Sequence, residues 1–142
     1  MRHAYLLPLL LVSATPRESP HMHIVIDTVS HSKQRYDTAG DYWLSSDGTM
    51  HIRVSRMADP RHEQLVALHE MVELMLVNSR KIPLTAIDEF DMGEGRSLAE
   101  PGDDIRAPYH REHQFAAMVE RLVAAELGVD WATYTTAVTS LK

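Results

Sequence analysis

The chain contains no cysteine. This absence excludes disulfide bonds, thiolate metal sites and cysteine nucleophiles from any account of the molecule. Nine histidines and twenty acidic residues are present among the 142 residues. Imidazole nitrogens and carboxylate oxygens are therefore the main side-chain ligands that the chain offers to a metal ion.

Basic and aromatic residues are also scarce. The chain has 14 Lys and Arg against 20 Asp and Glu, a formal net charge of −6, and an aromatic fraction of 6%. Nucleic-acid binding depends on a basic surface that neutralises phosphates, and single-strand binding also uses aromatic platforms. The composition therefore predicts no nucleic-acid partner.

No apolar run is long enough to span a membrane, so we expect no membrane insertion. The longest run, residues 4–12, follows Arg2 and precedes small residues that include Ala14. This arrangement is typical of a secretory signal cut after Ala14, which predicts a secreted or periplasmic protein. We favour the alternative that residues 1–21 are a non-native extension and that the chain starts at Met22, which predicts a cytoplasmic protein.

Residues 22–142 have the size of one globular domain, and the chain as a whole is 44% hydrophobic and 24% charged. Residues 23–27 are rich in β-branched side chains and predict a strand. Residues 41–54 predict a β-hairpin, because Asp47-Gly48 supports a tight turn between two alternating apolar rows. Three strands are too few to enclose a core. We therefore expect an α+β fold, with a mainly antiparallel three-stranded sheet packed on two long helices.

Four helices are expected after the hairpin. Two long helices are predicted at residues 60–78 and 109–127, and two short helices at residues 83–92 and 130–138. Asp59 and Pro60 suit the N-cap and the first position of the first long helix. Gly128 suits the end of the second long helix. Residues 93–108, rich in glycine and acidic residues, predict an exposed loop.

The periodicity of apolar residues assigns a buried face to each long helix. In the first helix this face consists of Leu65, Leu68, Val72, Met75 and Leu76. A second row, at the edge of that face, consists of His62, Val66, His69, Glu73 and Val77. In the second long helix the expected buried face is Phe115, Met118, Val119, Leu122 and Val123.

The first long helix carries the pattern His-Glu-x-x-Glu. His69 and Glu73 are four residues apart, so one helical turn places them on the same side, where they can bind one metal ion. Glu70 lies about 100° further round the helix and can act on a water at the metal without binding the metal itself. The pattern is that of the His-Glu-x-x-His zinc hydrolases with glutamate in place of the second histidine. The alternative is a half-exposed helix edge with an ordinary His–Glu pair.

A metal site of this kind needs a third protein ligand and one position open to water or substrate. The start of the second long helix offers His110, Glu112 and His113. His113 faces the small residues Ala116 and Ala117, which leave room for another helix, and imidazole is a common zinc ligand. We therefore predict His113 as the third ligand, with Glu112 as the alternative.

Five segments of the chain form a distinctive combination. They are Asp-Tyr-Trp at 41–43, His-Ile-Arg-Val at 51–54, Leu-His-Glu-Met-Val-Glu at 68–73, Ile-Asp-Glu-Phe-Asp at 87–91 and Pro-Tyr-His-Arg-Glu-His at 108–113. Together they resemble a group of small phage and prophage proteins with a zincin-like His-Glu-x-x-Glu motif. The resemblance covers residues 22–138 and implies a zincin-like domain. It also implies that His69 is a ligand, that Glu70 is the general base, and that residues 51–54 form the edge strand beside the substrate.

The predicted function is that of a metal-dependent, peptidase-like hydrolase with a peptide or protein substrate. His69, Glu73 and His113 would hold Zn²⁺ or another divalent transition metal, and Glu70 would take a proton from water. Glutamate in place of the second histidine adds negative charge, which makes the metal a weaker Lewis acid. The alternative is a non-catalytic metal-binding phage protein with a structural or host-interaction role, in which the metal joins two helices.

Overall fold

The computed structural model describes residues 21–142. The predicted N-terminal extension therefore lies outside the described residues, apart from its last residue, His21. The described chain folds into a three-stranded sheet and four α-helices, so the predicted α+β class is confirmed. None of the described helices has the length and apolar character that crossing a membrane requires.

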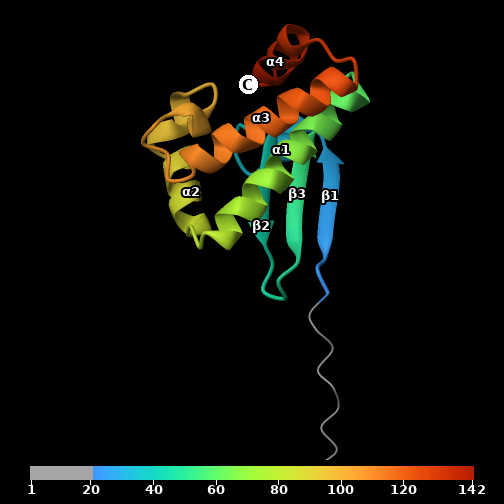
Figure 1. Ribbon diagram of the computed structural model, residues 1–142. Coiled ribbons are helices and arrows are strands. Elements are labelled where there is room, and N and C mark those ends of the chain that lie inside the picture. The colour runs from blue at the N-terminus through green and yellow to red at the C-terminus, as the bar shows by residue number, and fades with distance from the viewer. Residues whose placement is uncertain (1–20) are drawn as a thin grey trace, which may run out of the picture.

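β1 (Ile24–Val29), β2 (Gly40–Leu44) and β3 (Met50–Ser55) form one sheet in the order β1-β3-β2 (Figure 1). The central strand, β3, runs parallel to β1 and antiparallel to β2. The sheet is therefore mixed, and the prediction of a mainly antiparallel sheet is wrong. Residues 30–39, which include the 3-10 helix η1 (His31–Lys33), lead from β1 to the far edge of the sheet. The hairpin then places β3 in the gap beside β1.

β2 and β3 form the predicted hairpin, whose turn contains Gly48. The φ of Gly48 is +84°, a left-handed conformation that glycine adopts at no steric cost. The backbone N–H of Ser45 donates to the carbonyl of Thr49 at 3.0 Å and closes the turn. The register pairs Tyr42 with Ile52, and both side chains are buried, as the alternating pattern predicted.

The helices agree with the four predicted segments to within a few residues. They are α1 (Pro60–Ser79), α2 (Leu84–Met92), α3 (His110–Glu126) and α4 (Trp131–Thr139). The side chain of Asp59 accepts from the backbone N–H of Arg61 and caps α1. The side chain of Asp130 accepts from the backbone N–H of Thr133 and caps α4. These caps satisfy backbone donors that the first turn leaves without helical partners.

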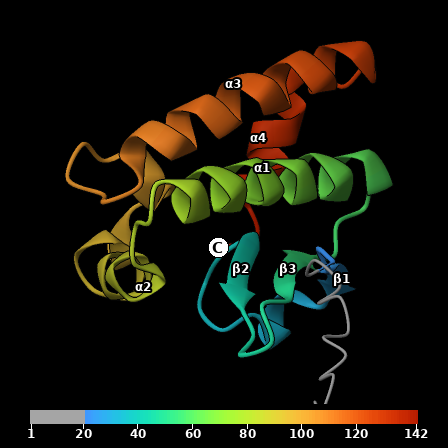
Figure 2. The same cartoon turned by 60° about the horizontal axis from the view of Figure 1, so that its bottom comes forward.

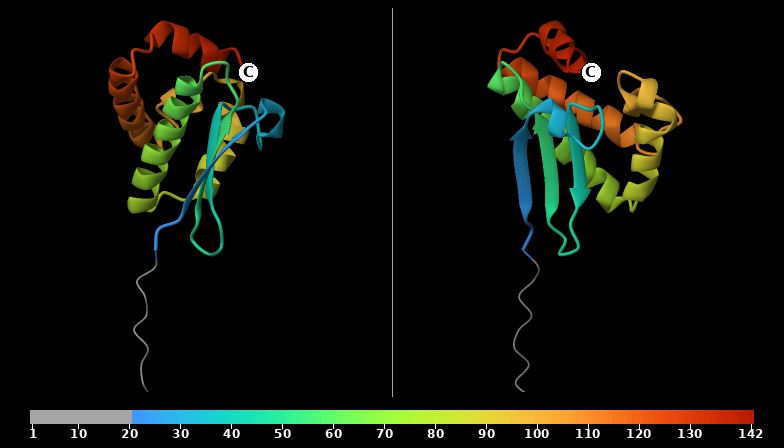
Figure 3. Two further views of the ribbon diagram at one scale, coloured as in Figure 1. Left: turned by 90° about the vertical axis from the view of Figure 1, so that its right-hand side faces the viewer. Right: turned by 180° about the vertical axis from the view of Figure 1, so that it is seen from behind.

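α1 lies between the sheet and α3 (Figure 2). It packs on β2 and β3 on one side and along α3 on the other, and it also contacts α4. α2 lies beyond the β2 edge of the sheet, and α4 lies at the top of the view in Figure 1. The side view in Figure 3 shows the same order of layers. Side chains of α1 therefore lie at the centre of the molecule.

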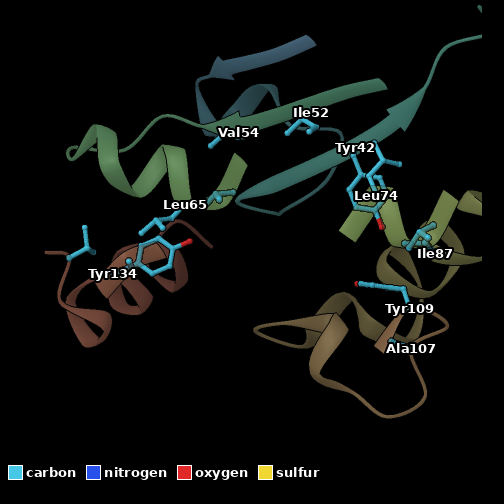
Figure 4. Close-up of a cluster of buried hydrophobic side chains, with 13 residues drawn as sticks. Tyr42, Ile52, Val54, Leu65, Leu74, Ile87, Ala107, Tyr109 and Tyr134 are labelled. Atoms are coloured by element: carbon cyan, nitrogen blue, oxygen red, sulfur yellow. The ribbon is translucent and has the colours of Figure 1, made fainter. Parts of the chain in front are cut away.

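The hydrophobic core fills the space between the sheet and the helices (Figure 4). Its buried members are Tyr42, Ile52, Val54, Leu65, Val66, Leu74, Val77, Ile87, Ala107, Tyr109, Ala124, Val129 and Tyr134. The three tyrosines bring a hydroxyl group into this core, and each hydroxyl donates a hydrogen bond to a buried carboxylate. The core is thus continuous with a polar cluster.

The buried face of α1 differs from the prediction. Of the five residues assigned to its core face, only Leu65 is fully buried, and Met75 is 52% exposed. The row that was assigned to the edge is buried instead: His62, Val66, His69, Glu73 and Val77. The reason is that α1 is covered by the sheet on one side and by α3 on the other. Polar residues of α1 that face either layer are therefore buried together with the apolar ones.

The face of α3 was also predicted wrongly. Phe115, Met118 and Leu122 are 46%, 59% and 70% exposed. The buried residues of α3 are Glu112, His113, Ala116, Glu120 and Ala124. Alanine permits a close approach of helices, and the charged residues have partners within the molecule. Hydrophobic periodicity alone therefore selects the wrong face of this helix.

Residues 93–108 are more ordered than the predicted exposed loop. They contain the 3-10 helices η2 (Glu94–Ser97) and η3 (Pro101–Asp103). Gly102 is buried against the imidazole of His113, since a Cβ atom at this position would lie 2.3 Å from the ring Cγ. The segment therefore covers one side of a predicted metal ligand.

Candidate metal centre

The three predicted ligands meet between α1 and α3. His69 and Glu73 lie one turn apart on the buried face of α1, and His113 faces them from the first turn of α3. His69 Nε2, Glu73 Oε2 and His113 Nδ1 lie 3.0–3.2 Å from one another. All three side chains are buried. This group, which we call the His–Glu–His cluster, could hold a metal ion.

Glu120 of α3 orients His69. The Nδ1–H of His69 donates to Glu120 Oε2 at 2.8 Å, because an ionised carboxylate can only accept. The other carboxylate oxygen of Glu120 accepts from the hydroxyl of Tyr134 on α4. With one hydrogen held on Nδ1, His69 presents Nε2 to Glu73 and His113, where Nε2 carries either a second proton or, once that proton is lost, a lone pair that could bind a metal. Carboxylates orient metal-binding histidines in this way.

His113 and Glu73 also have neighbours on the side away from the cluster. Asp103 of η3 places Oδ1 3.3 Å from His113 Nε2, which favours the tautomer with its lone pair on Nδ1. The hydroxyl of Tyr42 in β2 donates to Glu73 Oε1 at 2.7 Å, so that Oε2 faces the two imidazoles. Hydrogen bonds therefore fix His69 and Glu73 on the side away from the cluster, and a carboxylate lies near His113 on that side.

The donor set fits a divalent transition metal. In a tetrahedral zinc site the ligand atoms lie about 2.0–2.1 Å from the ion and therefore about 3.3 Å from one another. The separations of 3.0–3.2 Å in the cluster need to widen only slightly. Three lone pairs directed at one point repel one another unless a cation or a proton lies between them.

The pKa values show that the cluster attracts positive charge. Burial opposes a charged imidazole, but the hydrogen bonds to Glu120 and Glu73 outweigh it and raise the pKa of His69 well above 6.5. Burial also opposes a charged Glu73, but hydrogen bonds from His113 and His69 lower the pKa of Glu73 to about 2. A proton or a metal ion can satisfy the same group of atoms.

Glu70 lies beside the cluster on the adjoining face of α1. Its carboxylate touches the start of β2, since a Cβ atom on Gly40 would lie 2.4 Å from Glu70 Oε1. Within residues 21–142 no hydrogen bond or ion pair holds this carboxylate. Burial and the charge of Glu73 raise the pKa of Glu70 well above 4.5. Glu70 is thus an unengaged proton acceptor next to a candidate metal centre.

A cavity of about 620 Å³ opens beside the cluster. Its walls come from β2 and the loop before it, from all four helices, and from the segment that contains η3. The side chains of His69, Glu70, Glu73 and His113 all line this cavity. A cavity of this size can hold a small molecule or a short length of peptide, and such a ligand reaches the cluster directly.

Glu112 and residues 51–54 do not have the positions that the sequence predicted for them. Glu112, the alternative third ligand, pairs with Arg80 near the end of α1 and is not part of the cluster. The single-residue step from His113 to Glu112 turns the side chain about 100° round the helix. Residues 51–54 were assigned to the edge strand beside the substrate, which is wrong because they lie in the central strand β3. The edge strand beside Glu70 is β2.

The sequence did not assign a role to Glu120, Tyr134 or Tyr42. Glu120 follows His113 by seven residues, two turns along the same face of α3, and this spacing could have indicated it. Tyr42 and Tyr134 lie in β2 and α4, and no periodicity relates either residue to α1. Their contacts with the cluster depend on the tertiary fold.

Comparison of the chain with protein families, with curated proteins and with solved structures gives no match in any of the three cases. The class of the protein is therefore defined by its fold and its site. It is an α+β protein with a buried His–Glu–His cluster that could hold a metal ion. The resemblance to zincin-like phage and prophage proteins stays a prediction.

Proposed function

We propose that this protein is a metal-dependent hydrolase that acts on peptide bonds. The observation that carries the proposal is the convergence of three ligand atoms beside an accessible cavity, with Glu70 unengaged on the cavity wall. Metal hydrolases combine these parts: a metal held by three protein ligands, a position left for water or substrate, and a nearby general base.

In this proposal His69, Glu73 and His113 hold Zn²⁺ or another divalent transition metal. The metal would supply Lewis acidity, which lowers the pKa of water and polarises a carbonyl group. Glu70 accepts the proton of the attacking water and delivers it to the departing amine. Its freedom from hydrogen bonds and ion pairs within residues 21–142 suits this exchange of a proton.

β2 provides the edge strand of the proposed substrate site. Its Gly40 lies against Glu70, and its Tyr42 bonds to Glu73. An extended peptide can add to an exposed sheet edge through main-chain hydrogen bonds. The resemblance to zincin-like phage proteins implies an edge strand beside the substrate, and the edge strand that lines the cavity is β2 and not residues 51–54.

The second candidate function is that of a non-catalytic metal-binding protein, in which the metal joins α1 to α3. The burial of the cluster between these helices favours it. A purely structural site needs neither a cavity nor a carboxylate without partners. Glu70 and the 620 Å³ cavity therefore support the hydrolase over the structural role.

Metal analysis of the purified protein tests the site. We expect about one equivalent of divalent metal in the wild type and none in His69→Ala. His62→Ala is the matched control, because His62 is also buried on α1 but lies outside the cluster and the cavity. Equal metal content in the His69→Ala and His62→Ala variants would contradict the proposed ligand set.

Glu70→Gln tests the hydrolytic step, since glutamine keeps the size of the side chain and cannot accept the proton. We expect full metal content and a loss of about 10²- to 10⁴-fold in the rate of cleavage of a peptide pool, followed by mass spectrometry. Glu126→Gln, at the exposed end of α3, is the control for the change in charge. A metal-loaded wild type that cleaves no peptide would favour the structural role.

A further inference from the structure

One buried carboxylate of the cavity takes no part in the His–Glu–His cluster. Asp91, in the last turn of α2, lines the cavity and is 6% exposed. Its Oδ1 accepts from the hydroxyl of Tyr109 at 2.6 Å, and its Oδ2 accepts from the hydroxyl of Tyr36 at 3.1 Å. Both partners are neutral. No cation among residues 21–142 pairs with Asp91.

The basic residues around this part of the cavity form no ion pair with Asp91. Arg35 lines the cavity, and its guanidinium donates two hydrogen bonds to Asp41 and two to Asp88. Arg96 of η2 also lines the cavity, and among residues 21–142 no ion pair joins it to Asp91. Asp41, Asp88 and Asp91 therefore outnumber the two arginines in this region.

A buried carboxylate without a paired cation destabilises the folded state, because hydrogen bonds from phenolic hydroxyls replace only part of the hydration that the carboxylate loses. A carboxylate can accept about four hydrogen bonds, and Asp91 uses two. The remaining capacity of Asp91 is therefore free for a ligand that brings hydrogen-bond donors and positive charge.

The surroundings of Asp91 indicate what kind of cation fits. The apolar residues of α2 that line the cavity are Leu84, Ile87 and Met92. The ring of Tyr36 adds a further flat surface. Apolar surface that leads to a carboxylate matches a long basic side chain, whose methylene groups pack on the wall while its charged end reaches the acid. A small inorganic cation would gain nothing from the apolar wall.

We propose that the α2 end of the cavity is a specificity subsite for a basic side chain, Lys or Arg, of a peptide substrate. Asp91 pairs with the charge of that side chain. The subsite rests on the proposed function, because it names the class of substrate for the same cavity. Asp91 selects the substrate and does not touch the reacting bond.

Selectivity measurements test the subsite. Zinc-loaded protein is assayed with sets of peptides of otherwise identical sequence. Within a set, one position carries Lys, Arg, norleucine or Glu. Successive sets place this variable position at successive sites along the peptide. At one position we expect kcat/KM for Lys or Arg to exceed that for norleucine by at least about 10-fold, as a buried charge pair implies. In Asp91→Asn the ratio of Lys to norleucine should fall to near one.

Asp27→Asn is the matched control, because Asp27 is exposed on β1 and outside the cavity. It should retain the wild-type ratio of Lys to norleucine. Equal rates for Lys and norleucine at every position in the wild type would overturn the subsite, as would an unchanged ratio in Asp91→Asn.

A binding measurement separates failure of the subsite from failure of the proposed function. Zinc-loaded Glu70→Gln protein is titrated with the Lys and norleucine peptides in a calorimeter. Preference for the Lys peptide without any cleavage by the wild type would support the subsite and contradict the hydrolase. Cleavage without preference would support the hydrolase and contradict the subsite.

A competition experiment on the wild type needs no variant and covers the case in which Asp91→Asn does not fold. n-Butylammonium and its neutral analogue 1-butanol are added to the Lys-peptide assay. We expect n-butylammonium to inhibit competitively and 1-butanol to inhibit at least about 10-fold more weakly. Equal inhibition by the two compounds would contradict a charge-selective subsite.

Discussion

At the scale of single residues, the molecule buries several acidic side chains, and their partners differ. The pairs with a basic partner are Asp41 with Arg35, Glu112 with Arg80, and both Glu73 and Glu120 with His69. Asp91 differs from them because its partners are the hydroxyls of Tyr36 and Tyr109. Burial of a charge without a counter-charge costs stability, and such costs concentrate at functional sites.

The stability of Asp91→Asn should therefore depend on pH in a defined direction. Burial raises the pKa of Asp91 to about 6 from 3.8, although hydrogen bonds from Tyr109 and Tyr36 oppose the rise. The folded state then binds the proton more tightly than the unfolded state. Asp91 consequently destabilises the fold above about pH 6, and this penalty disappears as the pH falls toward 3.8.

Urea unfolding of the wild type and of Asp91→Asn measures this penalty. At about pH 7.5 we expect the variant to be more stable, by up to about 3 kcal/mol, because it carries no buried charge. At about pH 4 most of the difference should disappear, since Asp91 is then protonated in the folded state and partly protonated in the unfolded state. A variant that is less stable than the wild type at about pH 7.5 would show that the charge of Asp91 is compensated in the fold.

At the scale of helices and strands, local signals predicted the elements well. The Asp59 and Asp130 caps, the turn at Gly48 and the end of α3 before Gly128 all depend on interactions between residues close in sequence. The grouping of His69, Glu73 and His113 was also predictable. It follows from one helical turn and from the density of candidate ligands at the start of the second long helix.

The faces of the helices were not predictable from the same signals. Periodicity assumes that apolar residues are buried, but α1 and α3 meet through polar residues of the site. Phe115, Met118 and Leu122 remain largely exposed as a result. The contacts from Tyr42 and Tyr134 join segments far apart in the sequence, so only the tertiary fold reveals them. Sequence rules fail most at the places where a site replaces ordinary packing.

Two glycines provide a test of how separate elements position the site. A Cβ atom on Gly40 of β2 would meet the carboxylate of Glu70, the mobile end of a long side chain, at 2.4 Å. A Cβ atom on Gly102 of η3 would meet the ring of His113 at 2.3 Å, close to the root of the side chain. The contact at Gly40 also involves Glu70 Cγ at 2.7 Å, so it displaces the whole end of a flexible side chain, whereas the ring of His113 has less freedom to move.

We therefore expect Gly40→Ala and Gly102→Ala to affect different properties. Gly40→Ala should retain its metal and lose hydrolysis by about 10-fold or more, because it displaces the proposed general base. Gly102→Ala should bind the metal about 10- to 100-fold more weakly, because it displaces a ligand. Competition with a chelating dye measures the affinity, and the peptide assay measures the rate. The same metal affinity in both variants would contradict the assigned roles of β2 and η3.

At the scale of the whole molecule, the cluster joins layers that are distant in the sequence. α1 contributes His69 and Glu73, α3 contributes His113, and contacts with Tyr42 and Tyr134 connect the cluster to the sheet and to α4. The alanines of α3 bring the two long helices close without a wide apolar seam. An ion in the cluster would therefore stabilise the arrangement of all these elements together.

Thermal unfolding with and without metal tests this coupling. A ligand that binds only the folded state stabilises it by about 2.7 kcal/mol at a free concentration of 100 times Kd, which corresponds to a rise of roughly 10 °C in Tm for a domain of this size. We expect this rise when Zn²⁺ is added to chelator-treated wild type, and reversal when the chelator is added again.

Two variants test which residues bind the ion. His113→Ala should show no rise, because it lacks a ligand. Glu70→Gln should show the wild-type rise, because Glu70 lies beside the cluster and outside the ligand set. Loss of the rise in Glu70→Gln would make Glu70 a ligand and remove it from the role of general base, whereas an undiminished rise in His113→Ala would place the metal elsewhere.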